Sequence, residues 1–116
     1  MAETIFSKII RREIPANIVF ENDDVLAFRD IRPQAPTHIL IIPKTDEISK
    51  TTDIDGKKHA DLLGKLFDAA NELAKKENIA ESGFRLVLNC GPDSGQEVYH
   101  LHLHLLGGRK MTWPPG

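Results

Sequence analysis

Three histidines at alternating positions are the residues of this chain best suited to chemistry: His100, His102 and His104, with leucines between them. Successive side chains of an extended strand point to opposite faces, so a strand would place all three imidazoles on one face. A helix would spread them over about 200° of its circumference, because each residue turns by about 100°. The spacing therefore favours a strand, which Gly107 and Gly108 would end.

A row of imidazoles supports several kinds of chemistry. Neutral imidazole acts as a nucleophile, as a proton donor or acceptor, and as a metal ligand near neutral pH. Crowded imidazoles resist being charged together, which keeps one of them neutral and nucleophilic. Spacing alone leaves three interpretations open: nucleophilic catalysis, a zinc site built on a His-x-His pair, and a chance polar face of a half-buried strand.

The overall composition narrows the class of protein. The chain has 116 residues, 41% of them apolar and 28% charged, which predicts a single globular domain with one modest core. A net charge of −2 argues against a nucleic-acid polymer as partner, although backbone N–H groups and histidines can still hold a mononucleotide. The lone Cys90 offers no disulfide, and no apolar run reaches the about 18 residues of a membrane span. We therefore expect a cytoplasmic protein without a membrane partner, with a nuclear share left open.

Local patterns predict the elements that would position the histidines. Thr4 is expected to cap a short helix that runs to Arg12, and one long helix is expected from Asp55 or Gly56 to about Asn78. The segment Lys44–Asp55 lacks periodicity and is expected to be an exposed loop, and His59 is expected to face solvent without a functional role. Strands are expected at Ile18–Glu21, Val25–Asp30, His38–Pro43 and Phe84–Asn89, in addition to the histidine segment.

The histidine segment also resembles a known family. His100–Leu106 matches in full the pattern His-φ-His-φ-His-φ-φ, in which φ is apolar, of the histidine triad family. The resemblance is to the nucleotide-binding, nucleoside phosphoramidase branch of that family, and it covers essentially the whole chain. It also rests on the segments Phe28–His38, Gly95–Tyr99, Gly107–Arg109 and Trp113–Gly116.

This resemblance implies an α+β fold with an antiparallel sheet of about five strands, one long helix and one short helix. Residues 1–116 would form a single histidine triad domain with a short C-terminal tail over residues 110–116. The family is dimeric, with the two sheets joining into one continuous sheet, so a homodimer is expected. Trp113 in the tail would then lie beside the active site of the partner subunit.

The resemblance further implies an enzyme, a purine nucleoside phosphoramidase of the adenosine 5′-monophosphoramidase type. It would hydrolyse P–N and acyl linkages to nucleoside 5′-monophosphates such as AMP and GMP, through a nucleotidyl-histidine intermediate, with no cofactor and no metal. Two alternatives are a dinucleoside polyphosphate hydrolase of the same superfamily and a nucleotide-binding regulatory or scaffold protein.

Roles for single residues follow from the same resemblance. His102 would attack phosphorus, His104 would bind a phosphate oxygen and help to protonate the departing group, and His38 and His100 would brace the other two. The base would lie against apolar residues and the ribose against Asp30. Asn89 would contact the ribose or the phosphate, and the loop that follows it would hold the phosphate or the leaving group. The nucleotide-binding set is Ile5, Phe6, Ile9, Asp30, Ile31, Asn89, Gly95, Gln96, Glu97, His102 and His104.

Glu97 is the position where the chain departs from part of the family. Animal members of the branch carry serine there, whereas bacterial members can carry the acid. Glu97 precedes His100 by an odd number of residues, so strict alternation would place it on the opposite face to the histidines. It can face the site only if the turn at Gly95 and Gln96 redirects the chain, and otherwise it is a solvated acid in a turn.

Overall fold

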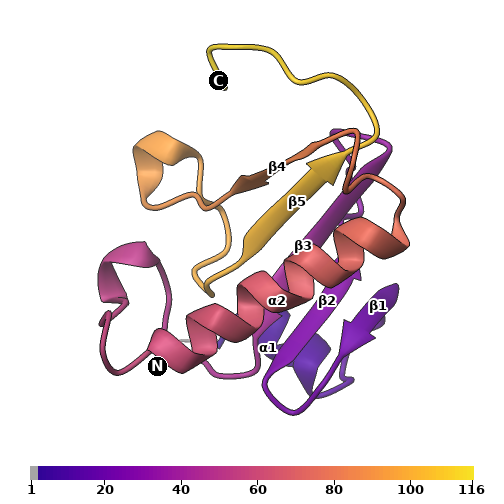
Figure 1. Cartoon of the computed structure of the whole chain (residues 1–116). Coiled ribbons are helices and arrows are strands. Elements are labelled where there is room, and N and C mark those ends of the chain that lie inside the picture. The colour runs from indigo at the N-terminus through magenta and orange to yellow at the C-terminus, as the bar shows by residue number, and fades with distance from the viewer. Residues whose placement is uncertain (1–2) are drawn as a thin grey trace.

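The computed structural model describes residues 3–116 and contains one open, five-stranded antiparallel sheet with two α-helices (Figure 1). The strands lie in the order β1-β2-β3-β5-β4, so the strand that carries His104 is flanked on both sides. This arrangement confirms the predicted α+β fold. The elements are α1 (Ile5–Ile10), β1 (Ile18–Glu21), β2 (Val25–Arg29), β3 (Thr37–Pro43), α2 (Ala60–Lys76), β4 (Phe84–Val87) and β5 (Leu103–Gly107), with 3₁₀ turns at Thr51–Asp53 and Pro92–Ser94.

The two faces of the sheet are covered by different helices, with α2 across one face and α1 against the other (Figure 1). Alternation along the strands sorts the side chains between these layers. In β3, Ile39 and Ile41 pack in the larger core with α2, whereas Leu40 and Ile42 pack with Phe6 and other apolar residues on the α1 side. Burial of both faces explains why β3 reads as an unbroken apolar run.

The histidine segment follows the predicted alternation, but only part of it is a paired strand. Leu101, Leu103 and Leu105 all lie in the core beneath α2, so the histidines between them face the α1 side. The paired strand β5 begins only at Leu103, and Leu101 instead donates its backbone N–H to the Ile48 carbonyl at 2.9 Å. His100 and His102 therefore lie in an extended lead into the strand.

The short helix α1 begins as predicted at Thr4. The Thr4 side chain accepts from the backbone N–H groups of Phe6 and Ser7, and the Ser7 side chain accepts from the Thr4 N–H, which completes a capping box. The helix ends at Ile10, before the predicted end at Arg12, which has a positive φ of 62°. Phe6 and Ile9 are buried against the sheet, while Ile5 is 53% exposed.

Two predictions about the segment before α2 were wrong. The segment Lys44–Asp55 is not simply exposed, because Ile48 is fully buried in the core beneath α2. His59 is also buried, and α2 begins after it, at Ala60. Its Nδ1 accepts the Asp55 backbone N–H at 2.8 Å, so the ring turns back into the bend instead of facing solvent.

The remaining boundaries differ from the predictions only at element ends. The helix α2 stops at Lys76, and β4 stops at Val87, short of the predicted Asn78 and Asn89. Among the described residues, no helix has the length and apolar character needed to cross a membrane.

The glycines of the fold give a stability prediction with two signs. A Cβ at Gly107 would lie 2.5 Å from Ile79 Cδ1, so Gly107→Ala should lower the free energy of unfolding by about 1–3 kcal/mol. Gly64 lies inside α2 with no atom near its Cβ position, so Gly64→Ala should raise it by about 0.5–1 kcal/mol. Urea unfolding of both variants measures the two changes. If both variants changed the free energy of unfolding equally, the space available for a Cβ atom would not explain the changes.

Candidate active site

A cavity of about 560 Å³ opens between α1, the segment after β2, the loop before the histidines and the histidines themselves. It brings together parts of the chain that are far apart in sequence, from the first helix to β5. Most of the residues that the resemblance implied line this cavity: Ile5, Phe6, Ile9, Asp30, Ile31, His38, Asn89, Gly95, Glu97, His102 and His104. Residues that were not anticipated also line it, among them Ile14, Ala16, Leu40 and Val98.

The hydrogen bonds of His102 determine which of its nitrogens is free. Its Nδ1 lies 2.7 Å from the His100 carbonyl oxygen. A carbonyl oxygen can only accept, so Nδ1 carries the proton and Nε2 keeps its lone pair. The ring packs edge-on against Phe6, with centroids 5.1 Å apart, which limits its rotation. His102 therefore presents an unprotonated, nucleophilic Nε2.

His104 has the opposite tautomer, fixed by a chain of hydrogen bonds from the backbone. The Gln34 N–H donates to His38 Nδ1 at 3.0 Å, so a neutral His38 carries its proton on Nε2. That Nε2–H donates to His104 Nδ1 at 2.9 Å, which places the His104 proton on Nε2. His104 Nε2 is buried and has no partner among the described residues. It is thus an N–H donor available to a ligand.

The two rings form a complementary pair. The centroids of His102 and His104 lie 4.9 Å apart, so a lone pair and an N–H donor stand side by side at the cavity. Burial lowers the pKa of His38 and of His102, and it lowers the pKa of His104 to about 4 with the help of the neighbouring His102 and His38. These rings are therefore neutral at pH 7, as nucleophilic chemistry requires.

The walls of the cavity combine apolar groups with one carboxylate. Ile31 is 90% exposed and Ile5 is 53% exposed, so two aliphatic side chains at the rim are free to contact a ligand. Asp30 accepts the Arg32 backbone N–H through Oδ1 at 2.8 Å, and its Oδ2 lies 3.5 Å from His38 Nε2. These contacts fix the carboxylate at the edge of the site.

The loop before the histidines turns Glu97 towards the cavity. Gly95 adopts a left-handed conformation with φ of 84°, which suits glycine, and bends follow at residues 98–100. Strict alternation consequently does not extend back to Glu97, which lines the cavity and is exposed.

Three residues of the predicted set lie away from the cavity. The side chain of Gln96 accepts from Gly91 N–H and donates to the carbonyls of Ser49 and Val98, so it braces the loop. His100 is buried behind His102, and its Nε2 donates to the Pro43 carbonyl at 2.8 Å. Trp113 is 82% exposed in a tail that extends away from the sheet (Figure 1).

The donor set also bears on the zinc interpretation. Asp30, His38 and His104 each offer one ligand atom, and these atoms lie within 4.8 Å of one another. His38 Nε2 and His104 Nδ1 are 2.9 Å apart and already share a proton. Tetrahedral zinc with bonds of about 2.0–2.1 Å holds its ligands at wider separation, so an ion here would replace that hydrogen bond and push the rings apart.

Comparison with known proteins identifies the family. The HIT domain profile matches residues 11–111. The chain belongs to the histidine triad family. It is 55% identical over 113 residues to "Adenylylsulfatase HINT1" of Arabidopsis thaliana, covering 97% of this chain and 76% of that protein. It is 55% identical over 109 residues to "Purine nucleoside phosphoramidase" of Escherichia coli K12, covering 94% and 90%.

A solved structure agrees in fold with this family member. The HIT family hydrolase from Legionella pneumophila matches with a TM-score of 0.94 and 54% sequence identity, covering 98% of this chain and 100% of that chain. At this identity and coverage the likeness extends over the sheet, both helices and the histidine segment.

The lowered pKa values of the histidines give a pH prediction. In the folded protein His104 has a pKa of about 4, whereas a histidine in the unfolded chain has a pKa near 6.5. As the pH is lowered, the unfolded chain therefore takes up this proton first. The unfolded state therefore binds more protons in this window, and stability should fall as pH is lowered from about 6.5 towards 4. Urea unfolding across this range measures the slope, and histidine NMR should place the His104 midpoint near 4. A stability that stayed flat over the window would contradict burial of neutral rings.

Proposed function

We propose that the protein hydrolyses purine nucleoside 5′-phosphoramidates through a covalent nucleotidyl-histidine intermediate. The chain is a nucleotide hydrolase of the histidine triad family. The observation that carries the finer proposal is the pair of opposite tautomers at the cavity: a free lone pair on His102 Nε2 beside a free N–H on His104 Nε2. A nucleophile beside an acid is what cleavage of a P–N bond requires.

The proposed reaction has two steps. His102 Nε2 attacks phosphorus and forms a P–N bond to the enzyme, while the bond from phosphorus to the leaving amine breaks and the amine takes up a proton. The Nε2–H of His104 would bind a phosphoryl oxygen and would help to protonate the amine. Water then attacks phosphorus and gives up a proton, which replaces the one that the amine took, while the bond from phosphorus to His102 Nε2 breaks and the nucleoside monophosphate is released. Acyl-nucleotide linkages would react in the same way.

The remaining proposals concern how the nucleotide lies in the cavity. Ile5, Phe6, Ile9 and Ile31 supply aliphatic and aromatic surface suited to a purine, and a hydrogen-bonded Asp30 can accept from ribose hydroxyls. Asn89, Gly95 and Glu97 would meet the phosphate and leaving group. AMP, GMP and their phosphoramidates are the expected ligands. For Gln96 the geometry favours bracing this loop over contact with phosphate.

Two alternatives use the same cavity. A dinucleoside polyphosphate hydrolase would employ the same pair of histidines with an anionic leaving group, which the exposed carboxylate of Glu97 would repel. A regulatory or scaffold protein would retain nucleotide binding without depending on turnover. Under either alternative we would still expect a single domain with a tail from Lys110. We would also still expect a cytoplasmic location, with no nucleic-acid or membrane partner.

A homodimer is part of the proposal. Strand β4 lies at an edge of the sheet, where its outer backbone groups are open to another strand. The large indole of Trp113 is 82% exposed in the single chain, and such surface is commonly covered by a partner. Pairing of two sheets at this edge would continue the sheet across the dimer, and each tail would reach towards the partner's active site.

The substrate proposal is tested by comparing kcat/KM for three substrates: an adenosine phosphoramidate, a dinucleoside polyphosphate and adenylyl sulfate. The phosphoramidate should be preferred, because its leaving group is an amine that accepts the available proton. His102→Asn should abolish its turnover, a loss of several orders of magnitude in kcat, and should leave AMP binding largely unchanged. A variant that kept a tenth of the rate would show that His102 is not the nucleophile, and preference for the dinucleotide would favour the first alternative.

Glu97 is expected to select the leaving group by charge. Its exposed carboxylate at the cavity should attract an ammonium-bearing leaving group by roughly 1 kcal/mol. Glu97→Ser should therefore lower kcat/KM several-fold for lysine-type phosphoramidates and much less for neutral amines. Added salt should narrow the difference in the unchanged protein. Equal losses for charged and neutral amines would remove the electrostatic explanation.

The tail is expected to matter for specificity more than for folding. Its one described side-chain anchor to the sheet is the Arg85 guanidinium, which donates to the Thr112 carbonyl at 3.0 Å. Deleting residues 111–116, or replacing Trp113 by alanine, should change the preference among leaving groups while leaving the melting temperature nearly unchanged. Light scattering at micromolar concentration should give the mass of a dimer. A monomeric mass would leave Trp113 without a partner's site to act on.

A further inference from the structure

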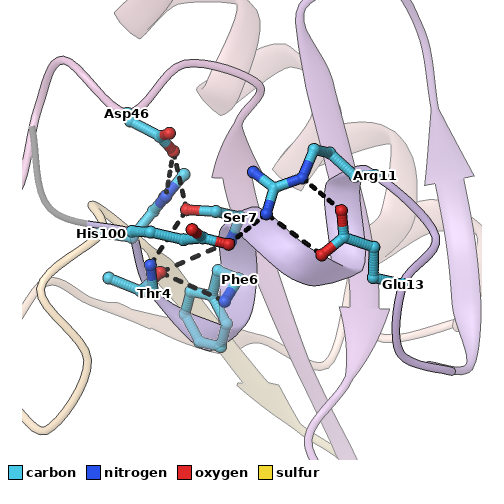
Figure 2. A network of polar contacts seen from close by, with 8 residues as sticks. Thr4, Phe6, Ser7, Arg11, Glu13, Asp46 and His100 are labelled. Carbon is cyan, nitrogen blue, oxygen red and sulfur yellow. Dashed lines mark hydrogen bonds and ion pairs between the residues drawn. The ribbon is translucent and has the colours of Figure 1, made fainter.

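His100 lies behind the cavity, and its hydrogen-bonding surroundings differ from those of His38 at the cavity. The His100 ring is 2% exposed, and both of its nitrogens face oxygen acceptors. Nε2 lies 2.8 Å from the Pro43 carbonyl. Nδ1 lies 3.4 Å from Asp46 Oδ1 (Figure 2). In contrast, His38 faces a backbone N–H on one nitrogen and an acceptor on the other.

This difference has a consequence for protons. A neutral imidazole has one N–H and one lone pair, so His38 is fully satisfied when neutral. A neutral His100 would donate to Pro43 and turn the lone pair of Nδ1 towards a carboxylate, which is repulsive. Only a second proton, lying between His100 Nδ1 and Asp46 Oδ1, satisfies both nitrogens.

Asp46 is held in place from the other side by α1. The Ser7 hydroxyl donates to Asp46 Oδ1 at 2.9 Å, and the same Ser7 oxygen accepts the Thr4 N–H in the capping box (Figure 2). Ser7 is 2% exposed. The three residues Ser7, Asp46 and His100 thus form a bridge from the helix that carries Phe6 and Ile9 to the residue whose carbonyl orients His102.

We propose that Asp46 is a positioning residue for the nucleophile, which holds a proton on His100 Nδ1 and so maintains a positive ring behind a neutral His102. This inference rests on the proposed function, because it concerns the reactivity of His102. The carboxylate is shared with Ser7, so the same group ties the wall of the cavity to the support of the nucleophile.

The charge balance of the pair opposes the effect of burial on the ring. Burial is the largest influence on the pKa of His100 and leaves that pKa below its ordinary value, while the Pro43 carbonyl and Asp46 act in the opposite direction. The protonated pair has no net charge, however, while the deprotonated pair keeps the full charge of the carboxylate at a partly buried site, so burial penalises both states. The charged or titratable groups that face His100 among the described residues are Asp46 and the neighbouring His102.

The protonated ring acts on His102 by its charge. A positive charge on His100 lowers the pKa of His102, so it disfavours a second positive charge there. His102 therefore keeps the lone pair on Nε2 to lower pH. Loss of the Asp46 charge should raise the pKa of His102 and narrow the pH range in which His102 is neutral and nucleophilic.

Asp46→Asn isolates this effect. The amide keeps the shape of the carboxylate. With its NH₂ at the Oδ1 position it donates an N–H to the lone pair of His100 Nδ1, so a neutral His100 becomes satisfied, while the Ser7 hydroxyl loses that acceptor. Nitrogen NMR at pH 7 should show both ring nitrogens of His100 protonated in the unchanged protein and only Nε2 protonated in Asp46→Asn. The acid limb of kcat/KM for an adenosine phosphoramidate should move to higher pH, with AMP affinity unchanged.

Glu47→Gln is the matched control, since it removes one carboxylate from the same segment, where Glu47 pairs with Lys58 and not with His100. It should leave the His100 NMR signals and the acid limb as they are, although Glu47 also lies 3.6 Å from His59 Nε2 and the His59 signals can change. The proposal is overturned if His100 Nδ1 lacks a proton in the unchanged protein, or if the acid limb is the same in Asp46→Asn. The NMR result does not depend on turnover, so a protein that failed to hydrolyse phosphoramidates would refute the proposed function while still reporting the His100 proton.

Discussion

The hydrogen bond from His102 Nδ1 to the His100 carbonyl is the interaction on which the site depends. It is a bond within one short segment, and it decides which nitrogen of His102 is free. Its geometry requires the segment to be extended, so that residues two apart lie on one face, and it requires the carbonyl to point along that face. The core beneath α2 meets the first requirement, because Leu101, Leu103 and Leu105 fix the opposite face of the segment. The buried leucines therefore determine which way the histidines point, and so the chemistry that the histidines can carry out.

A second constraint operates between strands. Leu40 lies opposite His104 in the pairing of β3 with β5, and His38 lies opposite Leu106. His38 and His104 are thus diagonal neighbours on one face, close enough for their rings to bond. A shift of one of these strands by one residue would move its histidine to the α2 face and separate the two rings. The tautomer of His104 consequently depends on the pairing of β3 with β5, which brings His38 within hydrogen-bonding distance.

Much of this could be predicted from the sequence, because alternation is a local signal. The strand that presents the histidines, the cap at Thr4 and the buried β3 all follow from neighbouring residue types. The errors fall where the determinant is not local. Ile48 lies in a segment without periodicity and is buried because the chain folds back beneath α2, and His59 is buried because its ring turns into the bend that precedes the helix. Gln96 is polar and close to the histidines, yet its partners Ser49 and Val98 could be known only from the fold. Asp46 gave no signal in sequence, since neither of its neighbours in space is near it in the chain.

The position of α1 relative to the sheet has a consequence for how the protein holds its ligand. The cavity is closed on one side by a six-residue helix near the start of the chain and on the other by a strand near its end. A helix this short has little stability of its own and depends on the contacts of Phe6, Ile9 and Ser7. A bound nucleotide would lie between these two ends and add contacts to both. Nucleotide binding would then stabilise the folded state of α1, and local unfolding of α1 would weaken nucleotide binding by the same free energy. Release of the product and unfolding of the first helix would therefore be coupled.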